Sequence, residues 1–228
     1  DTPAPGEIGI VEELLVDRAF VSDPQEAAML AELVDVKPTV PHNVLNALAA
    51  AGLVRALGVS PEAIRSALQN FSTGRHRIEE VAVHNGVTWI NDSKATNPHA
   101  ATASLLSSLS SIWVAGGLAK GAEMSELIAR CKSRIKAAIL IGTDRELIAK
   151  ELRAQAPEIE IVYIDAPDSY VKGGSDNSLM EAVIKAAAER ATSGDTVLMA
   201  PACASMDQFI SYSDRGDRFA AAVKKVTQ

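Results

Sequence analysis

From residue 87 onward, short apolar runs alternate with stretches whose apolar residues have helical spacing. A strand–helix–strand order is typical of right-handed crossover units, and such units build a mostly parallel sheet with helices on its faces. The sequence therefore predicts an α/β fold for this part of the chain. The expected strands are 87–90, 111–116, 137–142, 159–165 and 196–200, and the expected helices are 98–108, 123–134, 145–155, 178–192 and 215–226.

The preceding part of the chain has a different pattern. Residues 9–21 contain short apolar runs around an acidic turn, which predicts short strands. Residues 43–57 are rich in alanine and leucine and predict a helix, with Gly58 as its C-terminal cap. A second helix is expected to begin after Ser60, an N-cap residue that is followed by proline and an acid.

A basic stretch that contains a glycine separates these two patterns. We place a domain boundary there, near Ser72 to Gly74. With 228 residues, the chain is long enough for one large domain, or for one domain and part of another. The expected domains are 1–71 and 72–228.

Composition and charge exclude several classes of protein. Hydrophobic residues make up 47% of the chain and charged residues 22%, which is the balance of a globular protein rather than of a disordered one. The net charge of -7 argues against general nucleic-acid binding, which usually needs a basic surface. No run of about 18 apolar residues occurs, so we expect no contact with the membrane interior. We also expect a monomer.

The cysteines and the N-terminus indicate the compartment. Cys131 and Cys203 lie far apart, which gives neither a disulfide framework nor a metal-binding spacing. The first residues are acidic and lack the basic start of a signal peptide. We therefore expect a cytoplasmic protein with reduced thiols. The chain does not begin with methionine, which indicates a processed or excised piece.

Three polar clusters follow three of the expected strands, at residues 91–97, 116–121 and 201–209. In an open, Rossmann-like sheet, ligands bind beyond the carboxyl ends of the parallel strands. Strands that are distant in the sequence would thus bring their polar ends to one edge of the sheet. We predict a binding site at that edge.

The first cluster reads "NDSKATN" and stands at the start of an expected helix. A helix N-terminus favours anions, and Lys94 adds a mobile positive charge that suits a phosphate or an acyl phosphate. Asp92 is suited to accept a hydrogen bond from a ribose hydroxyl or to hold Lys94. The alternative is an N-capping turn with an incidental lysine.

The second and third clusters offer groups for a carboxylate ligand. Lys120 lies in "GGLAKG", where the glycines allow the backbone to approach a ligand closely, and this run is not a phosphate-binding P-loop. Ser205 carries a hydroxyl, and Tyr212 has a flat amphipathic face. The alternatives are a glycine turn with a solvated lysine, and small residues packed beneath a helix.

Two further groups of residues are candidates for nucleotide contacts. Arg77, next to His76 at the domain boundary, is suited to clamp a phosphate, although a basic linker is the alternative. Asn43 and Asn46 share one helix face, and their amides suit either a nucleobase edge or helix capping. The histidines are too isolated for a metal site, so we expect none.

Together these motifs resemble the Mur ligases, in particular the members that add D-glutamate. The resemblance runs from about Gly6 to the C-terminus, and the motifs occur in the family's order. The motifs are "HNVLNALAA", "GRHRIE", "INDSKATNP", "AGGLAKG", and "PACASMDQF" followed by "RG".

The resemblance implies a reaction. ATP would phosphorylate the carboxylate of UDP-N-acetylmuramoyl-L-alanine, and the amine of D-glutamate would attack the acyl phosphate. The resemblance also implies residue roles, which are as follows. Asn43 and Asn46 contact adenine; Asp92 contacts the nucleotide; His76, Arg77 and Lys94 contact the nucleotide and are catalytic; Thr96, Lys120, Ser205 and the backbone of Met206 line the D-glutamate pocket; and Tyr212 stands where the family has an aromatic residue.

The chain departs from the family in one large respect. The family's P-loop, its Mg²⁺ ligands and its UDP-binding domain have no counterpart in these residues. The chain resembles the tail of the ATP-binding central domain, residues 1–71, followed by a C-terminal domain, residues 72–228. We therefore expect the isolated chain to be inactive. The alternatives are another Mur or folylpolyglutamate ligase, or a non-catalytic module that binds a nucleotide or an amino acid.

Overall fold

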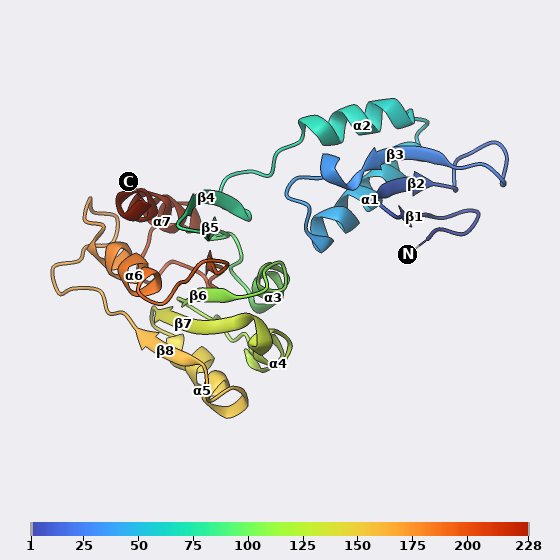
Figure 1. Ribbon diagram of the computed structural model, residues 1–228. Coiled ribbons are helices and arrows are strands. Elements are labelled where there is room, and N and C mark those ends of the chain that lie inside the picture. Colours follow the sequence, from blue (N-terminus) through green and yellow to red (C-terminus); the bar gives the residue numbers. More distant parts are fainter. Residues whose placement is uncertain (1, 228) are drawn as a thin grey trace. The chain divides into compact units, whose positions relative to one another are not determined.

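The computed structural model describes residues 2–227, which fall into two compact units that meet between Thr73 and Gly74 (Figure 1). The boundary expected from the sequence lies near Ser72 to Gly74. The assignment of the first unit to an ATP-binding central domain stays a prediction, since the fold of this unit alone does not test it.

The first unit packs two helices against a small antiparallel sheet with the strand order β1-β2-β3. Its core contains Leu15, Leu30, Val44 and Ile64, one or more from each layer. The third strand was not anticipated. The elements are β1 (Ile8–Val11), β2 (Leu14–Asp17), β3 (Ala28–Glu32), the 3-10 turn η1 (Leu33–Asp35), α1 (Pro41–Arg55) and α2 (Pro61–Asn70).

Local signals account for the ends of these helices. The Ser60 side chain accepts a hydrogen bond from the N–H of Ala63 at 3.3 Å, so the predicted N-cap of α2 is confirmed. Helix α1 ends two residues earlier than expected, at Arg55. Arg55 turns toward the sheet, and its Nε lies 2.7 Å from the buried carboxylate of Asp17.

The second unit is an α/β domain built on a six-stranded sheet with the order β4-β5-β9-β6-β7-β8. Every neighbouring pair is parallel except β4 and β5, which form an antiparallel hairpin. The prediction of a mostly parallel sheet is confirmed, whereas strand β4 was missed. The strands are β4 (Glu79–His84), β5 (Val87–Asn91), β6 (Ser111–Gly116), β7 (Ile135–Ile141), β8 (Glu160–Tyr163) and β9 (Thr196–Met199).

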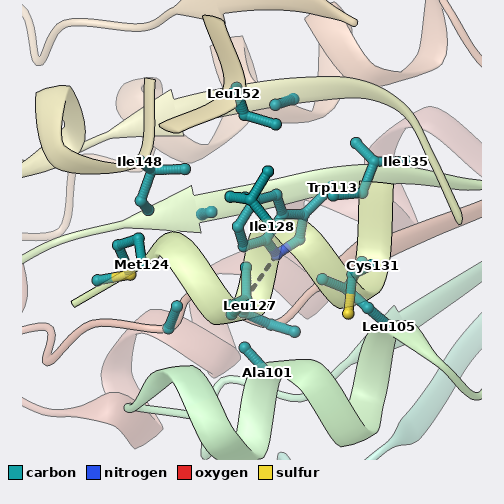
Figure 2. Close-up of a cluster of buried hydrophobic side chains, with 14 of the residues drawn as sticks. Ala101, Leu105, Trp113, Met124, Leu127, Ile128, Cys131, Ile135, Ile148 and Leu152 are labelled. Atoms are coloured by element: carbon teal, nitrogen blue, oxygen red, sulfur yellow. Dashed lines mark hydrogen bonds between the residues drawn. The ribbon is translucent and has the colours of Figure 1, made fainter. Parts of the chain in front are cut away.

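Helices cover both faces of this sheet. Trp113 on β6 lies among Leu105, Ile128 and Leu152 on one face, and its indole N–H donates to the carbonyl of Ala200 at 2.8 Å (Figure 2). All six residues of β6 are buried, as expected of a central parallel strand. The helices are α3 (Pro98–Leu105), α4 (Ser125–Cys131), α5 (Arg145–Gln155), α6 (Ser178–Ala188) and α7 (Tyr212–Thr227), with the 3-10 turn η2 (Lys132–Arg134) after α4.

The largest difference in helix boundaries concerns α6, which ends at Ala188 instead of residue 192. The start of α7 differs as well. This helix begins at Tyr212, three residues before the expected start, so that Tyr212 and Arg215 both lie in its first turn. Within residues 2–227, no helix has both the length and the apolar character that a membrane crossing requires.

Candidate ligand-binding edge of the sheet

Backbone hydrogen bonds join the three polar clusters at one edge of the sheet. The N–H of Gly116, at the end of β6, donates to Pro201 at 2.9 Å, and Ala202 donates to Ala95 at 3.0 Å. Leu118 and Ala204 exchange two further hydrogen bonds. The strands β5, β9 and β6 are neighbours, and the predicted convergence of their ends is confirmed.

A glycine is required where two of these clusters touch. Gly117 has φ +130°, and a Cβ at this position would clash with the carbonyl oxygen of Ala204. Any other residue would push apart the segments that follow β6 and β9. The "GG" of the second cluster thus serves close backbone packing at the edge.

Arg215 lies beneath this edge and was not singled out from the sequence. Its guanidinium is fully buried, with Nε 2.9 Å from Ser93 Oγ and Nη2 3.0 Å from the Ser93 carbonyl oxygen. Nη1 donates to the carbonyl of Cys203 at 3.2 Å and lies 3.5 Å from that of Gly116. Arg215 therefore contacts the segments that follow β5, β9 and β6.

The acceptors around Arg215 are neutral oxygens. Among residues 2–227, no carboxylate lies within ion-pair distance of its guanidinium. Burial lowers the pKa of Arg215 to about 10, so the group is still protonated near pH 7. The edge is thus built over a buried positive charge, which favours an anionic ligand.

Lys94 stands at the same edge, above the ring of Tyr212. Its Nζ is 3.9 Å from the ring centroid, a distance suited to a cation–π interaction. A hydrogen bond with Ser213 and the neighbouring Lys94 lower the pKa of Tyr212. Both Lys94 and Tyr212 are half-buried, so a ligand can reach them from the solvent.

Asp92, which precedes this lysine by two residues, is enclosed by protein. It accepts a hydrogen bond from the N–H of Ile78 at 3.3 Å. Burial raises the pKa of Asp92, although the Ile78 N–H and the charge of Arg77 oppose the rise. Its carboxylate fastens the segment before β4 to the end of β5, and a contact with ribose stays a prediction.

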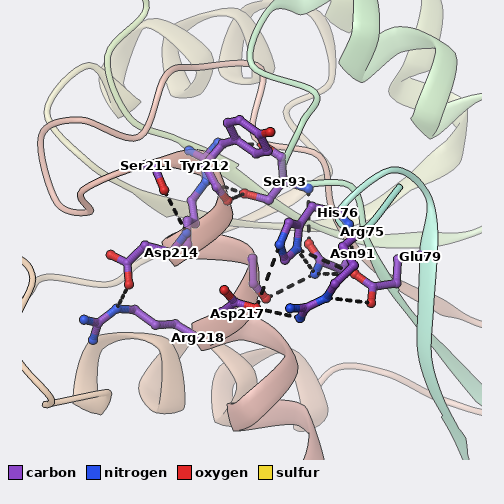
Figure 3. Close-up of polar contacts among 12 residues, drawn as sticks. Arg75, His76, Glu79, Asn91, Ser93, Ser211, Tyr212, Asp214, Asp217 and Arg218 are labelled. Atoms are coloured by element: carbon purple, nitrogen blue, oxygen red, sulfur yellow. Dashed lines mark hydrogen bonds and ion pairs between the residues drawn. The ribbon is translucent and has the colours of Figure 1, made fainter. Parts of the chain in front are cut away.

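His76 is also enclosed, with its side chain between β5 and α7 (Figure 3). Its Nδ1 lies 3.0 Å from Nδ2 of Asn91, which also donates to Glu79 and to the carbonyl of Gly216. A Cβ at Gly216 would clash with the imidazole. The geometry shows His76 as a packed side chain, and direct contact with a nucleotide is not supported by its burial.

The residues expected to bind D-glutamate lie on the segments after β5, β6 and β9. Thr96 is half-buried, and Lys120 is exposed with a positive φ of 52°. Ser205 is 3% exposed, and Met206 is 52% exposed. Among the described residues, no partner is found for Ser205 Oγ or for the N–H groups of residues 205–207. These donors are suited to a carboxylate.

Asn43 and Asn46 lie in the first unit, on α1. Asn43 Nδ2 donates to the carbonyl of Pro38 at 3.1 Å, and Asn46 is exposed. This bond is not a helix cap, because Val40 is the N-cap residue of α1 and no side chain caps this helix. Contact of either asparagine with adenine stays a prediction. A cavity of about 400 Å³ in the same unit is lined by none of the expected site residues.

The structure gives no support for metal or thiol chemistry in this part of the chain. No group of three or more His, Cys, Asp or Glu side chains within residues 2–227 is arranged to hold a metal ion. Both cysteines are buried and unpaired. Burial raises the pKa of Cys203 to about 12, so this thiol is not a nucleophile near pH 7.

The fold is that of an open α/β domain, and the edge beyond the carboxyl ends of its strands is where such domains bind ligands. Residues 76–203 match the family model described as "Mur ligase, glutamate ligase domain". This chain belongs to the Mur ligase family.

Two curated relatives have the same name. The chain is 51% identical over 224 residues to the UDP-N-acetylmuramoylalanine–D-glutamate ligase of Streptomyces avermitilis, and the aligned region covers 98% of this chain and 46% of the relative. The protein of the same name from Thermobifida fusca is 49% identical, and the aligned region covers 98% of this chain and 47% of that relative. The chain thus spans about half the length of these curated relatives.

A solved structure supports the fold. The pseudomurein peptide ligase type C from Methanothermus fervidus superposes with a TM-score of 0.61 at 17% identity, over 95% of this chain and 41% of that one. At this identity the similarity concerns the fold alone.

Proposed function

We propose that this chain is the C-terminal part of an ATP-dependent amide ligase that joins D-glutamate to UDP-N-acetylmuramoyl-L-alanine in peptidoglycan precursor synthesis. The observation that carries the proposal is the sheet edge, where Lys94, Lys120 and Ser205 lie on the three segments that the buried Arg215 contacts. Such an edge suits a phosphorylated donor and an amino acid with two carboxylates. The relatives with the corresponding name support the same substrates.

The proposed reaction has two steps. The carboxylate of UDP-N-acetylmuramoyl-L-alanine attacks the γ-phosphorus of ATP, which forms an acyl phosphate and releases ADP. The amine of D-glutamate then attacks the acyl carbon. The tetrahedral intermediate collapses to the amide when the C–O bond to phosphate breaks, and the amine loses a proton.

In this reaction Lys94 neutralises charge on the transferred phosphoryl group. Its ammonium lies over Tyr212 at a half-buried position that a phosphate can approach from the solvent. Arg77 is a second cation near this position. His76 is assigned a positioning role, since its buried ring supports the end of β5 from which Lys94 extends.

The acceptor site for D-glutamate lies mainly on the segments that follow β6 and β9. Lys120 pairs with one carboxylate of D-glutamate, while Ser205 Oγ and the backbone N–H of Met206 donate to the other. Thr96 donates its hydroxyl from the segment after β5. These groups hold the amine in a fixed orientation, which lowers the entropic cost of attack.

The proposed ligase also requires Mg²⁺ and a complete ATP-binding site. The described residues of this chain do not supply the Mg²⁺ ligands. They contain no suitable group of metal ligands. We therefore assign Mg²⁺ to the part of the relatives that this chain does not span, together with the P-loop. We further propose that Asn43 and Asn46 contact adenine, and that the ligase acts as a cytoplasmic monomer.

The test is turnover by a full-length ligase that contains this chain. Phosphate release should require D-glutamate together with UDP-N-acetylmuramoyl-L-alanine, and L-glutamate or L-alanine should not replace D-glutamate. Turnover with another acceptor in place of D-glutamate would instead favour a different Mur or folylpolyglutamate ligase. The isolated chain should form no amide, and amide formation by it would refute its assignment as a partial enzyme.

A non-catalytic binding module is the second candidate. The observation in its favour is that the described residues contain neither a P-loop nor a metal site. A search for the upstream reading frame distinguishes the two: a P-loop sequence there supports the ligase, and its absence supports the module.

A further inference from the structure

We propose that the connection between β8 and α6, residues 164–177, is a positioning element for the acceptor site. Through Tyr170 and Lys172 it fixes the backbone that presents the N–H groups of residues 205–207. This inference rests on the proposed function, because it assigns the turn at Ser205 to carboxylate binding.

Two side chains of this connection hold carbonyl groups of the turn. The Tyr170 hydroxyl donates to the carbonyl of Gln208 at 3.0 Å. Lys172 Nζ donates to the carbonyl of Met206 at 2.9 Å. Neither carbonyl has a backbone partner in the part of the chain that the structure describes. The connection thus supplies the donors that these two groups would otherwise take from water.

The geometry of the turn makes these contacts relevant to the site. Phe209 and Gln208 both donate to the Ser205 carbonyl, at 2.8 and 3.2 Å, so residues 205–209 form a helical turn. In such a turn, carbonyl groups face one end and free N–H groups face the other. Fixing the carbonyls of Met206 and Gln208 therefore fixes the direction of the N–H groups at the opposite end.

The connection is itself anchored to α7. The Arg218 guanidinium donates to the carbonyls of Gly174 and Asp176, and its Nε lies 2.8 Å from Asp214. Asn177 returns a hydrogen bond to the Arg218 carbonyl at 3.1 Å. Helix α7 also carries Tyr212 and Arg215 in its first turn. One helix therefore holds both the phosphate side of the edge and the connection that supports the acceptor side.

The two contacts differ in exposure. Tyr170 is half-buried, and its ring packs against the core face formed with α6 and α7. Lys172 is exposed, so its charge is screened and its contribution comes mainly from the hydrogen bond. Removing either donor leaves the fold intact and loosens the turn.

The test uses the full-length ligase and compares Michaelis constants for each substrate. Tyr170→Phe removes the hydroxyl but keeps the ring, and Lys172→Met removes the ammonium but keeps most of the aliphatic chain. Each should raise KM for D-glutamate about 2- to 10-fold, the range for one lost hydrogen bond. KM for ATP and kcat should change less than about 2-fold. Lys172→Arg should restore the wild-type KM.

Matched controls are available on the same domain. Tyr163→Phe removes a hydroxyl that bonds Arg153 at the far edge of the sheet, and Lys150→Met removes an exposed lysine of α5. Both should leave KM for D-glutamate unchanged.

The outcomes separate the inference from the proposed function. If the wild-type ligase does not use D-glutamate, the proposed function fails and the inference fails with it. If the wild type uses D-glutamate but neither variant raises its KM, only the positioning role is refuted. Equal increases in KM for D-glutamate and ATP would also overturn it, because a general loss of structure produces that pattern.

Discussion

Arg215 Nε and Ser93 Oγ lie 2.9 Å apart, although 122 residues separate them in the chain. Ser93 in turn donates from the same hydroxyl to the carbonyl of Tyr212 at 2.8 Å. The serine of the first polar cluster is therefore fully used inside the protein, between β5 and α7. The lysine that follows it is placed at the edge by this buried contact.

Replacing Arg215 should be severely destabilising. Arg215→Ala leaves the carbonyls of Ser93 and Cys203 without their donor, and it opens a cavity, so we expect a loss of about 3 kcal/mol or more. Arg215→Lys should recover only part of this, because an ammonium cannot reach both segments. Urea unfolding measures the change. Arg130→Ala, at an exposed position on α4, is the control and should cost less than about 0.5 kcal/mol.

The acid stability of the domain should depend on Asp195. Burial alone would raise the pKa of Asp195, but hydrogen bonds from Lys136, Ser110 and Thr192 outweigh this effect and lower it to about 2. A lowered pKa means that this contribution, about 2 kcal/mol, is present above pH 3.8 and is lost as the pH falls toward 2.

The check is the difference in unfolding free energy between wild type and Asp195→Asn as a function of pH. The difference should be constant between pH 5 and 7 and should shrink between about pH 4 and 2. A difference that does not vary over the acidic range would contradict the assignment.

Lys94→Ala should lower kcat of the full-length ligase by about 100-fold or more, because a developing phosphoryl charge loses its partner. Lys94→Arg keeps the charge and should recover part of the rate. Initial rates of amide formation at saturating substrate give kcat of both variants. The role fails if kcat of Lys94→Ala stays within 2-fold of wild type.

Tyr212 should affect kcat of the full-length ligase through its aromatic ring and not through its hydroxyl. Tyr212→Phe keeps the face beneath Lys94 and should change kcat little, whereas Tyr212→Leu removes a cation–π interaction worth about 0.5–1 kcal/mol. We expect a decrease in kcat of about 2- to 5-fold for the leucine variant only. Similar losses in both variants would point to the hydroxyl instead.

Lys120→Ala should raise KM for D-glutamate more than KM for ATP, since it removes binding to one substrate only. Lys150→Ala is the matched control and should alter neither constant. Equal effects of Lys120→Ala on both constants would argue against a carboxylate contact.

The sequence predicted the parallel strands and their common edge because alternating apolar runs report local structure directly. It also contained a signal for β4 that was not used. Asn85 and Gly86 both have positive φ between β4 and β5, and Asn-Gly is the usual turn of a two-residue hairpin. The polar residues at the ends of β5, β6 and β9 can therefore be grouped from the sequence, whereas the expected strands did not include the hairpin partner β4.

Arg215 and His76 could not be placed in this way. A charged residue in a helix is expected on the solvent side. Nothing in the spacing around Arg215 indicates that its guanidinium is buried and contacts three backbone carbonyl groups. His76 reads as a mobile basic group beside two arginines, but its burial depends on Gly216, 140 positions further along. Long-range packing of this kind leaves no local pattern.

The order of the strands in the sheet has a consequence for synthesis. Strand β9 is the last to leave the ribosome, yet it lies between β5 and β6. Until it arrives, β5 and β6 have no direct pairing, and the hairpin β4-β5 has no neighbour on its inner side. The nascent domain must keep this gap open while residues 117–195 are added, so the central pairing of the sheet depends on contacts of long sequence separation. A chain cut before residue 196 would lack the centre of its sheet.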